Sequence, residues 1–279
     1  MGAYGTDFER QLVRTDAGYV HLRMAGEQAA TPTVVLIHQS PASGRMWLGV
    51  MDELAPGVRS CAVDLLGYGE SDHPGRQLSL EEHAEHVFTA LDAAIDGPLL
   101  LVGHHTGAVM AAQIAATHPA AVRGLLLSGY PLYPDWGTKF DRLAPVLRPA
   151  DIGPDGEELC EIWRYVTGPL ETDADRDVAL TIMTDRLRAG RRWFTGYVQL
   201  LAADLDDVLA RAAQVDRERP TAVLTADRDP LLGYAKAVAA RLGVEPTTIS
   251  GTSWVSYEHP ERFRDPILGL VARVDEREG

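Results

Sequence analysis

The feature that most constrains this chain is residues 99–110, where a buried strand turns sharply into a helix. Residues 99–102 are all apolar, which is typical of a buried strand, and the alanine-rich segment after Gly107 is typical of a helix. Gly103 and Gly107 stand two residues on either side of His105. Glycines there let the strand and helix approach each other while the apical residue takes a strained left-handed conformation. The spacing predicts a tight turn with His105 at its apex.

The rest of the chain alternates between expected strands and helices. Short apolar runs predict strands near residues 8–14, 18–24, 33–38, 58–63, 122–128, 221–226 and 246–250. This alternation is typical of a parallel sheet covered on both faces. It stops at Tyr130, and residues 132–215 show only helical patterns with several aromatic residues. We therefore predict a doubly wound, mostly parallel α/β core formed by residues 1–131 and 216–279, with a helical lid inserted at 132–215.

The charge of the chain restricts its partners. A net charge of −14 over 279 residues argues against binding to nucleic acid or to an anionic membrane. No apolar run is long enough to cross a membrane, and two cysteines are too few for a disulfide framework. We expect a cytoplasmic protein whose partner is a small-molecule substrate. The composition does not predict an oligomeric state.

Several motifs, in order, resemble those of the α/β-hydrolase superfamily over nearly the whole chain. They are the oxyanion strand ending at His38, the D-x-x-G-x-G-x-S loop at 64–71, the acid-bearing turn at 226–230, and the start of the last helix at 258–263. The turn at 103–107 occupies the place of the superfamily's nucleophile elbow. The resemblance implies an α/β-hydrolase fold, with Asp229 as the acid of the catalytic triad.

The chain departs from this superfamily at the residues that usually perform the chemistry. His105 stands at the elbow apex in place of the nucleophile, and Ser253 occupies the usual position of the catalytic histidine. Gln39 follows His38 where the superfamily usually has glycine. A Ser–His–Asp triad therefore cannot be assembled at the usual positions, and of its members only the acid, Asp229, remains.

The candidate site residues follow from this substitution. Exchanging serine and histidine between facing positions preserves their combined reach, so a hydrogen bond from His105 to Ser253 is expected. Asp229 either orients an imidazole or caps the turn before Pro230. The resemblance implies an oxyanion hole made by two backbone N–H groups, and the donors and lid residue that we expect around the substrate are Thr106, Ser40, Gln39 and Trp136. Gln39 either fills this hole or adds an amide donor to it.

An imidazole at the apex has three chemical uses. It can attack an acyl group, activate water to hydrolyse an ester or lactone, or remove a proton from carbon. The replaced nucleophile favours His105 as a general base, with no cofactor or metal. The fold is known to host elimination reactions, including loss of a carboxylate from polyketide-type secondary metabolites, so we expect a lyase of this kind. Hydrolysis by activated water is the first alternative, and a non-catalytic ligand-binding protein is the second.

Overall fold

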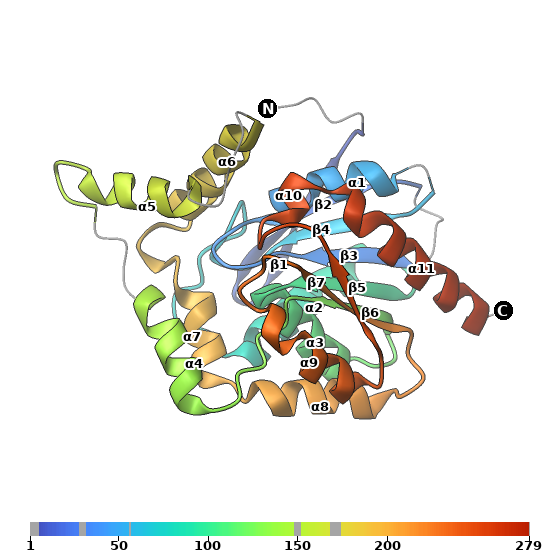
Figure 1. The fold of residues 1–279 in the computed structure, drawn as a ribbon. Helices are drawn as coiled ribbons and strands as arrows, with labels where there is room; N and C mark the ends of the chain where they lie inside the picture. Colours follow the sequence, from blue (N-terminus) through green and yellow to red (C-terminus); the bar gives the residue numbers. More distant parts are fainter. Residues whose placement is uncertain (1–5, 28–31, 56, 148–151, 168–173, 279) are drawn as a thin grey trace.

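The computed structural model describes residues 6–27, 32–55, 57–147, 152–167 and 174–278, and its core is an eight-stranded sheet (Figure 1). The strand order is β1-β2-β4-β3-β5-β6-β7-β8, and only the β1–β2 and β2–β4 pairs are antiparallel. The strands are β1 (Glu9–Thr15), β2 (Gly18–Ala25), β3 (Thr33–Ile37), β4 (Ser60–Asp64), β5 (Leu99–His104), β6 (Val122–Ser128), β7 (Thr221–Ala226) and β8 (Pro246–Ile249). The predicted mostly parallel α/β-hydrolase sheet is confirmed.

Helices cover both faces of the sheet and explain why its central strands are continuously apolar. One face packs on α2 (Leu80–Ala94), α3 (Thr106–Thr117), α8 (Leu205–Val215) and α9 (Ala235–Leu242). The other packs on α1 (Leu48–Leu54), α10 (Val255–Glu258) and α11 (Glu261–Glu278). In β5, Leu99 and Leu101 face the first layer, and Leu100 and Val102 face the second. Every residue of β5 is therefore buried.

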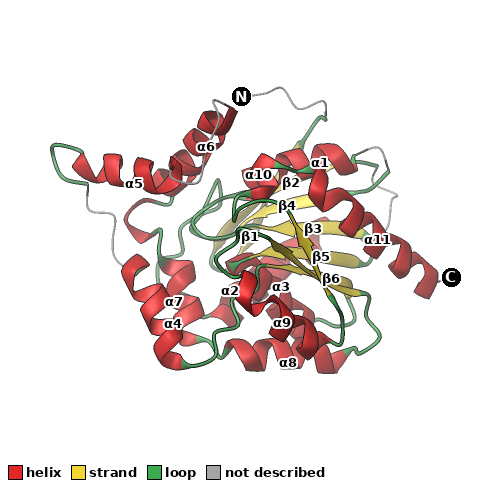
Figure 2. Ribbon diagram, in the orientation of Figure 1, coloured by secondary structure: helices red, strands yellow, loops and turns green. Residues whose placement is uncertain are grey.

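The segment between β6 and β7 contains helices and no strand among its described residues. Figure 2 shows these helices as two pairs on the left of the sheet: α4 (Trp136–Leu143) with α7 (Thr195–Ala202), and α5 (Glu157–Thr167) with α6 (Ala174–Arg188). We call α4 to α7 the cap. The last helix of the predicted lid, α8, packs instead against α3 and α9 beside the sheet. Residues 148–151 and 168–173 of the predicted lid lie outside the described residues.

Short 3-10 helices complete the described secondary structure: η1 (Gly44–Trp47), η2 (Ala144–Val146), η3 (Gly190–Arg192) and η4 (Leu232–Tyr234). Within the described residues, no helix is both long enough and apolar enough to cross a lipid bilayer.

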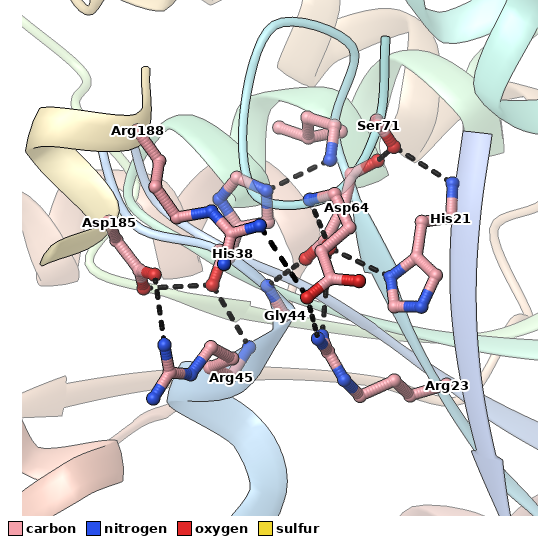
Figure 3. A network of polar contacts seen from close by, with 12 residues as sticks. His21, Arg23, His38, Gly44, Arg45, Asp64, Ser71, Asp185 and Arg188 are labelled. Atoms are coloured by element: carbon pink, nitrogen blue, oxygen red, sulfur yellow. Dashed lines mark hydrogen bonds and ion pairs between the residues drawn. The ribbon is translucent and has the colours of Figure 1, made fainter. Parts of the chain in front are cut away.

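A largely buried polar network joins the cap to the core (Figure 3). Asp185 of α6 is 1% exposed, and its Oδ2 accepts a hydrogen bond of 2.8 Å from the hydroxyl of Ser43, which precedes η1. Arg45 Nη1 lies 3.9 Å from Asp185 Oδ1, and Arg188 of α6 pairs with Glu70 at 3.6 Å. The end of α6 is thereby tied to two core segments.

Two buried carboxyl groups of this network have pKa values shifted in opposite directions. Burial would raise the pKa of Asp64, but a 2.8 Å hydrogen bond from His21 and the charge of Arg23 hold that pKa at about 2. At Asp185, burial dominates over the Ser43 hydrogen bond and the charges of Arg45 and Arg23, and it raises the pKa to about 6. The negative charge of neighbouring Asp64 acts in the same direction as burial. Ionisation of Asp185 therefore lowers the stability of the folded protein.

Asp185→Asn should stabilise the protein at neutral pH. Because the pKa of Asp185 is raised on folding, the native state binds more protons between about pH 4 and 6, so wild-type stability falls as pH rises through this window. The neutral amide of the variant avoids a loss of about 3 kcal/mol at pH 7.5. Urea unfolding should show that the wild type and Asp185→Asn are equally stable near pH 4, and that Asp185→Asn is more stable than the wild type at pH 7.5. Asp141→Asn, on exposed α4, should show no such difference.

Candidate active site

The predicted turn is present at the end of β5. His105 has φ 50° and ψ −114°, and it is the only described non-glycine residue with positive φ. Its backbone N–H donates to the carbonyl of Ser128 in the neighbouring strand β6, at 2.9 Å. α3 begins at the next residue, Thr106. The strained apex is thus held by a strand on one side and a helix on the other.

The two flanking glycines are required by close backbone contacts. A Cβ built on Gly103 would overlap the carbonyl oxygen of Gly107, and a Cβ on Gly107 would overlap the carbonyl oxygens of Ile37 and His38. Since these obstacles are backbone atoms, they cannot move away as a side chain can. The start of α3 is therefore packed directly against the end of β3, which places His105 beside the loop that follows β3.

The imidazole of His105 forms a pair with Asp229. His105 Nε2 donates to Asp229 Oδ2 at 2.7 Å, and Asp229 Oδ1 accepts the backbone N–H of Leu231 at 2.7 Å. Burial would raise the pKa of Asp229, but the charge of His105 and its hydrogen bond lower it to about 2. In a neutral ring whose Nε2 carries the proton, Nδ1 holds the free lone pair. The side chain of His105 is 16% exposed and that of Asp229 is fully buried.

His104 lies under this pair as a neutral ring. Its Nε2 donates to the carbonyl of Ser253 at 2.9 Å, and its Nδ1 accepts from the hydroxyl of Ser128 at 2.9 Å. The ring stacks on that of His105, with centroids 4.2 Å apart. Burial, and then the neighbouring His105, lower the pKa of His104 to about 3. His104 therefore serves as a fixed support for His105.

His104, His105 and Asp229 place three potential metal-ligand atoms within 4.8 Å of one another. A histidine binds a metal through an unprotonated nitrogen. Both nitrogens of His104 are already committed, because Nε2 needs its proton for the Ser253 carbonyl and Nδ1 accepts the Ser128 hydroxyl. The donor set fits a His–Asp pair on a neutral support better than a metal centre.

Ser253 and Gln39 lie at the site with roles that differ from the expected ones. The His105 imidazole turns to Asp229, and a hydrogen bond from His105 to Ser253 is not found among the described contacts. Ser253 instead offers its backbone carbonyl, which accepts from His104 and, at 3.3 Å, from Gln39 Nε2. The Gln39 amide thus holds the loop after β8.

Ser40 and Thr106 are in direct contact. The Ser40 N–H donates to Thr106 Oγ1 at 2.6 Å, so this predicted oxyanion donor already has a partner. Trp136, expected near the substrate, is 61% exposed on α4. It lies against Phe140 and lines a 400 Å³ groove formed with residues 133–135, Lys139 and residues 201–206. The structure does not bring Trp136 together with His105.

Two tyrosines that the sequence did not single out link the cap to Ser40. The hydroxyl of Tyr197 on α7 donates to the Ser40 carbonyl at 2.6 Å. The hydroxyl of Tyr68 accepts the N–H of Gly196 at 2.8 Å, and a Cβ on Gly196 would overlap Ser40 Oγ. Tyr197 is one of many aromatic residues in the cap segment, so composition could not select it. Tyr68 stands within the D-x-x-G-x-G-x-S loop, which is the available signal for its position.

Comparisons with known proteins agree with this geometry. A family model described as the α/β-hydrolase fold matches residues 32–152. A haloalkane dehalogenase of Mesorhizobium japonicum is 35% identical over 97 residues, which cover 35% of this chain and 31% of the dehalogenase. The chain thus spans about a third of the length of that curated relative.

Solved structures match over a longer part of the chain. The thioesterase domain from the curacin biosynthetic pathway has a TM-score of 0.72 at 20% identity, covering 94% of this chain and 99% of that domain. A hydrolase from Pseudomonas aeruginosa PA01 has a TM-score of 0.75 at 20% identity, covering 96% and 99%. This chain therefore has the α/β-hydrolase fold.

Gly107→Ala should destabilise the protein strongly, because its Cβ would push α3 away from the β3 carbonyls. We expect a loss of about 3 kcal/mol in the free energy of unfolding, measured in urea. Gly269→Ala is the matched control, since this helical glycine in α11 has open space around its Cβ position. It should stabilise by about 0.5–1 kcal/mol. A Gly107→Ala protein as stable as wild type would contradict the proposed steric role.

Proposed function

We propose that this chain is a cofactor-independent enzyme in which the His105–Asp229 pair acts as a general base on a small organic substrate. The supporting observation is the 2.7 Å hydrogen bond from His105 Nε2 to Asp229 Oδ2 at the strained apex. It leaves His105 Nδ1 as the lone-pair nitrogen. The buried carboxylate also stabilises the imidazolium that forms when this nitrogen takes a proton.

Elimination of a carboxylate is the reaction that this arrangement supports best. In a carbonyl compound with an acyloxy group on the β carbon, Nδ1 removes a proton from the α carbon and the electron pair moves to the carbonyl oxygen. The resulting enolate re-forms its carbonyl and expels the carboxylate. The start of α3 supplies positive electrostatic potential to the enolate oxygen. The partly exposed His105 then returns its proton to solvent.

The position of the base favours proton removal from carbon over attack on an acyl group. His105 stands where the superfamily places its nucleophile. No described residue supplies a second imidazole that could activate a nucleophile at this position, because His104 is fixed by Ser128 and Ser253. A base at the apex meets the substrate directly. Proton abstraction then requires only this base and an oxyanion donor.

Hydrolysis of an ester or lactone is the second candidate. In this reaction, His105 Nδ1 takes a proton from water, and the hydroxide attacks the carbonyl carbon. The structural similarity to a thioesterase domain and to a hydrolase supports this alternative. A protein that only binds ligands remains the third alternative, and it would be stabilised by a ligand without converting it.

His105→Ala should abolish most of the turnover. Loss of a positioned general base typically costs about 10²–10⁴-fold in rate. The measurement is kcat/KM on β-acyloxy ketones, lactones and activated esters, with product analysis to separate elimination from hydrolysis. His105→Ser restores the usual apex without an imidazole to activate it, so it should not gain esterase activity. Near-wild-type turnover by His105→Ala would show that the elbow is not the reaction centre.

Asp229→Asn should also lower kcat, because an amide NH₂ facing His105 Nε2 favours the tautomer with the proton on Nδ1, which removes the base. We expect a loss of about tenfold or more on the substrate found above, with the fold preserved. Asp227→Asn is the control on the same turn: Asp227 accepts the Gly251 N–H at 2.9 Å and does not contact His105. Equal losses in both variants would indicate damage to the turn and would contradict the assignment of Asp229.

A further inference from the structure

The donor that the superfamily would supply from the loop after β3 is engaged in this chain. The Ser40 N–H lies 2.6 Å from Thr106 Oγ1, and the Thr106 hydroxyl in turn lies 3.3 Å from Ser40 Oγ. Both residues are buried, with Ser40 3% and Thr106 7% exposed. A hydroxyl oxygen accepts one hydrogen bond while its own proton is donated elsewhere. The short bond makes Thr106 Oγ1 an acceptor, and the hydroxyl proton of Thr106 is donated to Ser40 Oγ over the longer 3.3 Å contact.

Thr106 also lies at the N-terminus of α3. It is the first residue of α3 and follows His105 directly. The first N–H groups of a helix have no acceptor within the helix, and they lie at the positive end of its dipole. The backbone N–H and the side-chain hydroxyl of Thr106 are thus two donors of one residue beside the base.

We propose that the side-chain hydroxyl of Thr106 is an oxyanion donor, polarised by the Ser40 N–H, and that it acts together with the Thr106 backbone N–H. The hydroxyl keeps its proton throughout and only donates a hydrogen bond. This assignment rests on the proposed general-base function of the same site. It replaces direct donation from Ser40 by a relay from Ser40 through the Thr106 hydroxyl.

The distances support the relay over direct donation. For the Ser40 N–H to bind substrate, its 2.6 Å bond to Thr106 must break. In the relay, Thr106 gives up only the 3.3 Å contact with Ser40 Oγ and gains a shorter bond to an anion. A hydroxyl that already accepts a hydrogen bond is a stronger donor, and burial strengthens such chains.

The cap holds Ser40 in the position that the relay needs. Tyr197 Oη donates to the Ser40 carbonyl at 2.6 Å, and the backbone at Gly196 lies against Ser40 Oγ. Ser40 is therefore held by α7 as well as by Thr106. Turning the Ser40 N–H toward a substrate would also turn the Gln39 carbonyl of the same peptide, which accepts the Ala42 N–H at 2.8 Å and lies 2.9 Å from His38 Nδ1. Rotating the Thr106 hydroxyl proton would disturb neither contact.

The test uses 4-nitrophenol, whose ionised oxygen imitates the enolate and whose absorbance reports ionisation. Binding is measured in His105→Ala protein, so that the imidazole contributes no charge. Bound 4-nitrophenol should ionise at a lower pH than the free compound. Thr106→Val keeps the shape but removes the hydroxyl, and it should weaken the preference for phenolate over phenol by about 10- to 100-fold. Thr106→Ser keeps the hydroxyl and should retain most of that preference.

Each outcome decides the assignment. Thr106→Val protein that favours phenolate as strongly as its parent overturns the relay, and so does a parent that shows no preference for phenolate. If Thr106→Ser loses as much as Thr106→Val, the side-chain shape matters instead of the hydroxyl, and the proposal fails. Full turnover by His105→Ala would refute the general-base function, whereas the phenolate result stands independently of it. Thermal unfolding of each variant confirms that it is folded.

Discussion

The hydrogen bond between His105 and Asp229 is the interaction on which the rest of the site depends. These residues are far apart in sequence, and they follow β5 and β7, which lie on either side of β6 in the sheet. Because parallel strands present their carboxyl ends at one edge, the fold brings both residues to the same place. Gly129, which follows β6 with φ 60°, has no Cβ that would overlap the imidazole ring between them.

The loop that contains Ser40 is held from three directions. Asp64 Oδ1 accepts the N–H of Gly44 at 2.6 Å, and Asp185 of the cap accepts the hydroxyl of Ser43. Tyr197 of the cap holds the Ser40 carbonyl. Two of these contacts come from cap helices, so the position of the Ser40–Thr106 pair depends on how α6 and α7 dock. The cap is thus part of the support of the site.

The fold could be predicted from the sequence because its determinants are local. The backbone contacts around Gly103 and Gly107 allow only glycine, and the strand–helix alternation fixes the layers. The position of Asp229 follows from its turn. Whether His105 pairs with Asp229 or with Ser253 depends on the direction in which the His105 ring points, and the sequence pattern does not determine that direction. The contacts of Tyr197 and Thr106 with Ser40 depend on tertiary packing. The helical pattern of α8 is the same whether this helix packs in the cap or beside the sheet, so its packing against α3 could not be predicted.

Placing histidine at the apex changes what the neighbouring loop has to do. An imidazole is longer than a serine side chain, so His105 reaches Asp229 directly, at 2.7 Å, without an intermediate residue. The loop after β8 then does not need to supply a histidine for this pair. Its carbonyl at Ser253 instead accepts His104 and Gln39, which stiffen the floor and the side of the site. In the proposed function, the His105–Asp229 pair acts as a general base without a covalent intermediate, and these fixed contacts hold its surroundings in place.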